Sequence, residues 1–209
     1  MRGCFASDES IPPTGAQRGG LRAIAASLPV SRGKRPLAER AAARNRAILW
    51  MFFDTGISLS ELCALRMADV DRAHGMMTIR GQGARARSLA LGPQDLRQLR
   101  SYLEQYRPKQ EELVAWGNAN EDHLFLSETR RALTMSGIAR LFVRLRRRAG
   151  IIGKQVSPQM LRHSFALRYL QAGGSPRRLQ EVLGYAGMAQ IKQYLRWHNQ
   201  VIHGNTQDT

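Results

Sequence analysis

The sequence predicts a mainly α-helical domain with one small antiparallel β-sheet, an α+β fold. Three observations support this prediction. Apolar residues recur at helical spacing in most segments after residue 36. Two short runs of β-prone residues flank a glycine-rich turn. The first 35 residues are rich in Gly, Pro, Ser and Arg and show no sustained periodicity. We therefore expect a disordered basic arm over residues 1–35, a folded domain over 36–198 and a short tail over 199–209.

Two helices are expected at the start of the domain. The segment Leu37–Phe53 has the spacing of one or two helices and ends at Thr55-Gly56. A short helix should follow over Glu61–Arg66, with Ser60 as its N-cap because a serine side chain can accept a hydrogen bond from the first turn.

A β-hairpin is expected next, with strands at Met76–Arg80 and Ser88–Leu91 around the turn Gly81-Gln82-Gly83. Pro93 then suits the first turn of a helix, because that position needs no backbone N–H donor. The apolar stripe of this helix is formed by Leu96, Leu99 and Leu103.

The next helix opens at Ser136 or Gly137 and is stopped by Gly150. Its inward face holds Ile138, Leu141, Phe142 and Leu145. Its other face carries five arginines: Arg140, Arg144, Arg146, Arg147 and Arg148. This arginine run is either a solvated face or a phosphate-contacting stripe, and the net charge makes these two interpretations about equally strong.

Three more helices complete the domain. One follows Pro158 and runs to Gln171, before Gly173-Gly174. Ser175-Pro176 starts the next, which runs through Leu183, and the last should contain Lys192–Trp197.

The charge balance points to a polyanionic partner. The chain has 32 Lys+Arg against 16 Asp+Glu, a formal net charge of +16. Such an excess attracts nucleic acid or an acidic membrane surface. The longest apolar run, Ile48–Phe53, is far shorter than the roughly 20 residues of a spanning helix. We therefore expect no membrane partner and predict that double-stranded DNA is the partner.

Several classes of site are absent from the sequence. Cys4 and Cys63 alone make no disulfide framework and suit a reducing compartment, so we expect a cytoplasmic protein. No secretory signal peptide is visible. No His/Cys/Asp/Glu cluster has metal spacing, and there is no glycine-rich nucleotide loop. We expect no metal and no cofactor.

Four segments, in this order and at this spacing, carry a resemblance. They are Thr55-Gly56-Ile57-Ser58-Leu59-Ser60-Glu61-Leu62, the hairpin Ile79–Arg87, Ser157-Pro158-Gln159-Met160-Leu161-Arg162-His163-Ser164-Phe165-Ala166, and Leu183-Gly184-Tyr185 followed by Tyr194. Together they resemble the catalytic domain of the tyrosine recombinases, the phage-integrase and Xer-type family. The match covers roughly residues 36–197.

The resemblance implies a fold and a chemistry. The family's domain is mainly helical with a small sheet and grips duplex DNA as part of a clamp. A tyrosine attacks the scissile phosphate and forms a 3′-phosphotyrosyl link. Two arginines stabilise charge on the phosphate, a hairpin lysine protonates the leaving 5′ oxygen, and two further residues, usually His and His or Trp, assist. An N-terminal helical domain normally completes the clamp, and residues 1–35 cannot supply it.

This chain keeps two of the six family positions. The second arginine corresponds to Arg162 and the nucleophile to Tyr194. The other four positions are degenerate: the first arginine falls on Ser58, the lysine on Gln82, the first histidine on Gln159 and the His or Trp on Tyr185.

The replaced residues lack the chemistry that the family uses. Ser58 has no charge and cannot make two hydrogen bonds to a phosphate as an arginine does, and losing such a donor typically costs about 2.7–4 kcal/mol of transition-state stabilisation. Gln82 and Gln159 have no titratable proton. Arg85 and Arg87 lie near the lysine position, but arginine stays protonated and makes a poor acid. Tyr185 is the mildest change, since its hydroxyl can bond a phosphate oxygen.

Each site residue also has a plainer interpretation. Taken alone, Tyr194 is most simply interpreted as a half-buried tyrosine on a helix, and Arg162 as a solvated arginine on a helix. His163 reads as a structural core histidine. His198, four residues after Tyr194, could replace a lost proton shuttle, but a surface histidine is the commoner case.

Three hypotheses follow from these observations. The first is a DNA-binding member of the family, associated with site-specific recombination and integration, that cuts DNA weakly or not at all alone. Such a pseudoenzyme is a decayed mobile-element gene or a non-catalytic partner of active recombinase subunits. The second is an active strand-exchange enzyme that uses Tyr194 and Arg162. The third is a non-catalytic DNA-binding regulator. In each, the predicted DNA contacts are Arg85, Arg87, Arg140, Arg144 and Arg147.

Overall fold

The computed structural model describes residues 36–80, 86–118, 121–148 and 156–204 of the 209-residue chain. It confirms the predicted fold class: helices surround a three-stranded antiparallel sheet. The predicted arm over residues 1–35 lies outside the described residues.

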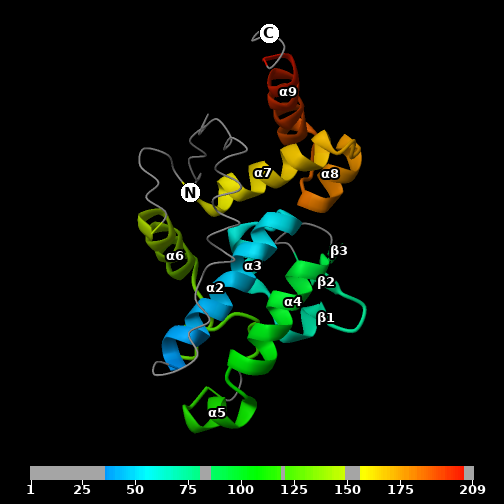
Figure 1. Ribbon diagram of the computed structural model, residues 1–209. Coiled ribbons are helices and arrows are strands. Elements are labelled where there is room, and N and C mark those ends of the chain that lie inside the picture. Colours follow the sequence, from blue (N-terminus) through cyan, green and yellow to red (C-terminus); the bar gives the residue numbers. More distant parts are fainter. Residues whose placement is uncertain (1–35, 81–85, 119–120, 149–155, 205–209) are drawn as a thin grey trace, which may run out of the picture.

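Helix α2 (Pro36–Thr55) runs through the middle of the molecule (Figure 1). It is a single helix, and every residue from Ala47 to Phe53 is buried. Because Ala47–Phe53 is covered by the protein on every side, this part of the sequence is continuously apolar and shows no single apolar face.

Helix α3 (Leu59–Ala64) begins two residues earlier than predicted. Its N-cap is Ser58, and the prediction that Ser60 caps this helix is wrong. The physical reason is a capping box: Ser58 Oγ accepts from Glu61 N, while Glu61 Oε2 accepts from Ser58 N. Ser60 has no glutamate or glutamine three residues later to complete such a box.

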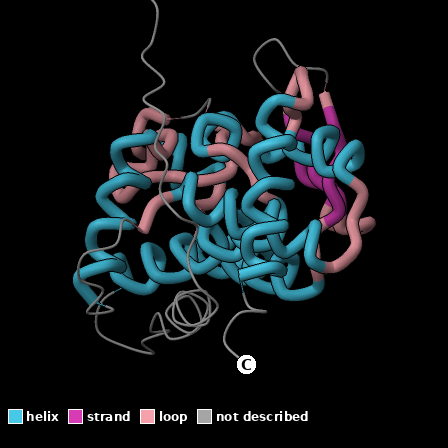
Figure 2. The backbone as a smooth tube through the Cα atoms, turned by 90° about the horizontal axis from the view of Figure 1, so that it is seen from above, coloured by secondary structure: helices cyan, strands magenta, loops and turns pink. Residues whose placement is uncertain are grey.

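The sheet lies at one edge of the molecule (Figure 2). The short 3₁₀ helix η1 (Met67–Asp69) leads into strand β1 (Val70–Asp71), which pairs with β2 (Met76–Ile79), and β2 pairs with β3 (Arg87–Ala90). The predicted hairpin is thus present, with Met77 opposite Leu89. Strand β1 was not predicted, because two residues are too short to show alternation.

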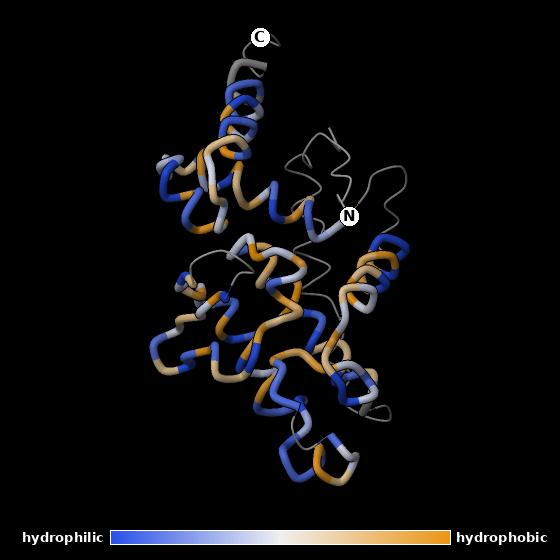
Figure 3. Tube along the Cα trace, turned by 180° about the vertical axis from the view of Figure 1, so that it is seen from behind, coloured by the Kyte–Doolittle hydropathy of each residue, from blue (hydrophilic) through white to orange (hydrophobic). Residues whose placement is uncertain are grey.

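Helix α4 (Pro93–Ser101) starts at the predicted proline and packs against α2. It continues into the π-helical turn η2 (Tyr102–Tyr106), and α5 (Gln110–Ala115) follows. The sequence analysis did not predict α5. Amphipathic helix α6 (Met135–Arg148) buries the four predicted apolar residues, and orange and blue segments alternate along it in Figure 3.

Helices α7 (Pro158–Gln171), α8 (Pro176–Leu183) and α9 (Ala189–Gly204) lie together at one end of the molecule (Figure 1). The bounds of α7 and α8 agree with the prediction. Helix α9 extends through residues 199–204, which the sequence analysis assigned to a tail, because neither glycine nor proline interrupts the chain between Trp197 and Gly204.

Two hydrophobic clusters hold the domain together. The larger contains α2, the sheet and α6, and the smaller is formed by α7, α8 and α9. Helix α7 contributes Leu161 to the first cluster and Ala166 and Leu170 to the second. It therefore connects the two, and the candidate site lies along it. Within the described part of the chain, no helix has the length and hydrophobicity needed to cross a bilayer.

Candidate active site and nucleic-acid interface

The structure brings together three predicted site residues that are separated in the sequence. Arg162 is on α7, Tyr185 follows α8, and Tyr194 is on α9. The Tyr185 hydroxyl oxygen lies 3.3 Å from Arg162 Nε and 3.3 Å from Tyr194 Oη. Tyr185 therefore occupies the space between the predicted nucleophile and the predicted phosphate-binding arginine.

Local sequence sets the position of each side chain. Ser157 caps α7 by accepting from Met160 N, and Pro158 occupies its first turn. Helix α8 ends at Gly184, which adopts the left-handed conformation with φ +70°. A Cβ at Gly184 would lie 2.6 Å from Arg87 Nη1, so any other residue would be strained and would displace the Arg87 guanidinium. Tyr185 follows directly and turns back toward α7.

Arg162 is buried and is held by backbone carbonyls. Its Nη1 donates to Gly56 O and its Nη2 to Leu183 O, both at 2.7 Å. Its guanidinium carbon also lies 4.8 Å from the centre of the Tyr185 ring. These contacts orient Arg162, and they connect α7 to the turn after α2 and to the end of α8.

Tyr194 is 2% exposed and lies in the smaller hydrophobic cluster. Its Oη lies 2.8 Å from His163 Nδ1 and 3.3 Å from Tyr185 Oη. Burial raises the pKa of Tyr194 above its usual value, and Tyr185 raises it further, while the charge of Arg162 opposes the shift. The phenol therefore needs a proton acceptor to become a nucleophile near neutral pH.

His163, which the sequence analysis interpreted as structural, contacts the predicted nucleophile. It follows Arg162 directly, yet the helix turns its ring toward α9, where it contacts the rings of Tyr194 and Trp197. The signal that could have identified it is its ionisable ring within the segment that carries Arg162. Only the packing of α7 against α9 shows that the ring meets the phenol.

Ser58 and Arg162 are both close to the carboxylate of Glu61. Glu61 Oε2 accepts from Ser58 N at 2.9 Å and lies 3.7 Å from Arg162 Nη1. The position where the family has its first arginine is thus next to the retained arginine, but Ser58 uses its hydroxyl to cap α3.

Arg87 has its contacts inside the protein. Its side chain is 11% exposed, its Nη1 donates to Glu61 Oε1 at 2.7 Å, and its Nε donates to Val182 O. This geometry favours a structural role for Arg87, joining β3 to α3 and α8, over the predicted contact with DNA.

The other degenerate positions are separated from this network or cannot be placed. Gln159 is exposed in the first turn of α7. Gln82 and the predicted DNA contact Arg85 lie outside the described residues. His198 is half-buried on α9.

The predicted DNA-binding arginines of α6 are exposed, as expected for phosphate contacts. Arg140 and Arg144 line an open groove of about 450 Å³, together with Arg44 and Arg131, which the sequence analysis did not single out. Hydroxyl groups of Ser127, Thr129 and Thr134 also line it, and Glu128 is its one carboxylate. Arg147 is exposed outside this groove.

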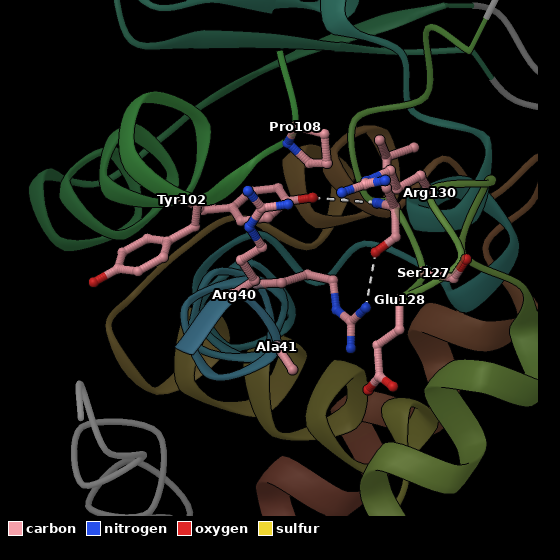
Figure 4. Close-up of a pocket in the computed structure, with 10 residues that line it drawn as sticks. Arg40, Ala41, Tyr102, Pro108, Ser127, Glu128 and Arg130 are labelled. Atoms are coloured by element: carbon pink, nitrogen blue, oxygen red, sulfur yellow. Dashed lines mark hydrogen bonds between the residues drawn. The ribbon is translucent and has the colours of Figure 1, made fainter. Parts of the chain in front are cut away.

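Figure 4 shows a smaller cavity of about 30 Å³. Arg44, Ser127 and Glu128 line both the groove and this cavity. Its wall includes Tyr102, whose hydroxyl accepts from Leu126 N. It has room for no more than a few waters, so it is not a substrate site.

Glu121, Asp122 and His123 offer ligand atoms within 4.8 Å of one another. These groups already bond to the protein: Glu121 accepts from His123 and from Ala132 N, and Asp122 pairs with Arg66. We assign no metal to this cluster.

The sequence of the chain is similar to sequences of known proteins. The sequence model of the phage integrase family matches residues 34–200. Tyrosine recombinase XerD of Oceanobacillus iheyensis is 34% identical over 151 residues, covering 72% of this chain and 49% of that protein. The chain spans about half the length of the curated relatives that it matches.

Solved structures agree in fold. XerA recombinase gives a TM-score of 0.71 with 25% identity, over 96% of this chain and 66% of the other. XerH recombinase, solved in a post-cleavage complex with a palindromic difH substrate, gives 0.73 with 21% identity, over 98% and 55%. The ordered motifs, the helical fold around a small sheet and the family match lead to one conclusion: this chain belongs to the phage integrase family of tyrosine recombinases.

Proposed function

We propose that this chain is a DNA-binding protein of site-specific recombination whose own site cleaves DNA weakly or not at all. One observation carries the proposal. Tyr185 lies between Arg162 and Tyr194, with its hydroxyl 3.3 Å from each, so both retained residues line one site, while Ser58 is a helix cap with no charge.

The retained pair can perform only part of the reaction. Tyr194 supplies a nucleophilic oxygen and Arg162 a permanent positive charge beside it. Neither provides the second guanidinium for the phosphate or a proton for the leaving oxygen. Gln82 and Gln159 cannot supply that proton, because an amide has no titratable proton. Each such loss typically slows a reaction by about 10²–10³-fold, so cleavage of ordinary DNA should be close to undetectable.

Binding to DNA depends on charge and needs none of the lost groups. The net charge is +16, and α2, α6 and the 127–134 segment together contribute four arginines to the lining of one groove. The XerH neighbour was solved with a recombination substrate. We infer that duplex DNA is the partner, in the cytoplasm, with other recombinase subunits on the same DNA supplying full chemistry.

A nicked suicide duplex tests the proposal. The wild-type chain should shift this DNA in a gel but form no covalent adduct that survives denaturation. An adduct that disappears in the Tyr194→Phe variant would instead support an active recombinase, while failure to bind DNA at low salt would contradict the proposal altogether.

The active-enzyme alternative has one observation in its favour. Tyr194 retains a titratable partner, since its oxygen lies 2.8 Å from His163 Nδ1. A DNA-binding protein without any cleavage activity would not need this contact. The regulator alternative predicts a footprint at a promoter, including that of its own gene, and no adduct under any condition.

A further inference from the structure

We propose that His163 is the general base that takes the phenolic proton of Tyr194 when this tyrosine attacks a phosphate. The inference rests on the proposed function of the site and adds a catalytic residue at a position where the family pattern placed none. Hydrogen-bond direction, geometry and the chemistry of the neighbouring positions support it.

Arg162 sets the direction of the first hydrogen bond in the network. A guanidinium can only donate, so Tyr185 Oη accepts from Arg162 Nε. The Tyr185 proton is then free to point at Tyr194 Oη. When it does, the Tyr194 proton points at the remaining partner, His163 Nδ1, at 2.8 Å. With this orientation, and with His163 in the tautomer that leaves Nδ1 unprotonated, the network runs from a fixed cation, through two phenols, to an imidazole nitrogen that accepts.

The geometry places the imidazole where a base must lie. A general base has to be within about 2.6–3.2 Å of the oxygen whose proton it takes. His163 meets this limit, and of the two contacts to Tyr194 Oη it is the shorter. The edge-on contact of its ring with Trp197, at 5.4 Å between centroids, helps to hold this orientation.

No other described candidate fits as well. Gln159, at the position of the family's first histidine, is exposed and cannot take a proton. Tyr185 is itself a phenol. Because burial disfavours the Tyr194 phenolate, unassisted ionisation would be rare, and a base in contact with the oxygen removes this barrier.

The chemical step can be written in full. An incoming phosphate oxygen replaces the Tyr185 hydroxyl beside Arg162. The bond between Tyr194 Oη and phosphorus forms as the O–H bond breaks and its proton passes to His163 Nδ1. The bond from phosphorus to the 5′ oxygen breaks, its electron pair stays on that oxygen, and a proton from water neutralises it. In the reverse step the 5′ hydroxyl gives its proton to hydroxide from the solvent as its oxygen attacks phosphorus, the bond between phosphorus and Tyr194 Oη breaks, and His163 returns its proton to that oxygen.

The test isolates deprotonation of Tyr194 from protonation of the leaving group. In DNA with sulfur in place of the bridging 5′ oxygen, the leaving thiolate needs no proton. The lack of a general acid at Gln82 should therefore not slow this reaction. We expect the wild-type chain to form a covalent adduct with this duplex, and His163→Asn to slow adduct formation by roughly 10²-fold or more.

Two matched variants make the result specific. Asparagine at 163 keeps an acceptor oxygen near the place of Nδ1 but cannot take a proton, so His163→Asn should retain the wild-type melting temperature and DNA affinity. His198→Asn, on the same helix as Tyr194, should react at the wild-type rate. The wild-type rate should also rise with pH as an imidazole deprotonates, and this rise should be absent in His163→Asn.

The outcomes separate this inference from the proposed function. An adduct that forms equally fast in His163→Asn overturns the assignment of the base. A wild-type chain that binds the sulfur-containing duplex and forms no adduct also overturns it, while leaving non-catalytic DNA binding intact. A chain that does not bind the duplex contradicts the proposed function itself.

Discussion

Glu61 is the residue at which three parts of the candidate site meet. Its carboxylate accepts from Ser58 N and from Arg87 Nη1, and it lies 3.7 Å from Arg162 Nη1. Burial by itself would raise the pKa of Glu61, but the hydrogen bonds from Arg87 and Ser58 outweigh it and hold the pKa below its usual value.

Replacing Glu61 by glutamine should therefore cost stability in a pH-dependent way. A carboxylate with a depressed pKa in the folded state stabilises the fold above its unfolded pKa, and this contribution is lost as pH falls through the folded value. We expect Glu61→Gln to lower the free energy of unfolding by roughly 2 kcal/mol at pH 7, with the difference shrinking below about pH 4.

Urea unfolding at pH 7 and pH 3.5 measures this difference. The control is Glu181→Gln, which breaks an exposed pair with Arg178 and should cost less than about 0.5 kcal/mol. Equal losses at both pH values would show that the charge of Glu61 is unimportant.

Gly184 illustrates a glycine that both conformation and packing require. Alanine there would sit in the left-handed region, at about 1–2 kcal/mol, and its Cβ would push Arg87 from its contacts with Glu61 and Val182. Gly184→Ala should lower the melting temperature by several degrees, whereas Gly187→Ala, whose Cβ meets nothing within 4 Å, should change it little. Calorimetry of both variants checks this, and equal melting temperatures would contradict it.

Restoring the lost groups should restore some chemistry only when they are restored together. We expect Ser58→Arg, Gln82→Lys and Gln159→His in one chain to give a Tyr194-dependent adduct with ordinary suicide DNA, and each alone to give little, because the groups act on one transition state. Ser58→Arg should also cost about 1 kcal/mol of stability, since it removes the cap of α3.

The control for this experiment is the same triple variant with Tyr194→Phe. A triple variant that binds DNA and forms no adduct would show that loss of function extends beyond these three positions.

At the scale of an element, α6 combines two roles on opposite faces. Its apolar residues pack into the larger core, which holds the helix in place, and its arginines are exposed, with Arg140 and Arg144 lining the groove. The same amphipathic pattern therefore positions the charge that DNA would meet.

Charge on α6 should appear in the salt dependence of DNA binding. Each phosphate contact that is lost should reduce the slope of log K against log salt by roughly 0.9. We expect Arg140→Gln, Arg144→Gln and Arg147→Gln each to flatten the slope by about this amount, and Arg97→Gln, exposed on α4, to leave it unchanged. Fluorescence anisotropy across a salt series measures the slope, and a flat wild-type response would remove the basis of this prediction.

At the scale of the whole molecule, α7 joins the two hydrophobic clusters of the described residues. The chain spans about half the length of the curated relatives that it matches.

Removing residues 1–35 should leave the domain folded, since their sequence shows no sustained apolar periodicity. DNA binding should weaken only modestly, because most of the positive charge lies in the rest of the chain. Thermal unfolding of the truncated chain measures this, and loss of a cooperative transition would show that the arm contributes to the core.

The sequence by itself determined the fold class, most helix bounds and the family positions of Arg162 and Tyr194, because apolar periodicity, capping residues and ordered motifs are local properties. Helices α7 and α8 could be placed from Ser-Pro starts and glycine ends. Only the tertiary structure decided that Arg87 faces inward and that His163 contacts Tyr194. These facts depend on how α7 packs against α9 and β3 against α8, and the contacts join residues 31 and 95 positions apart, a separation that no local pattern records.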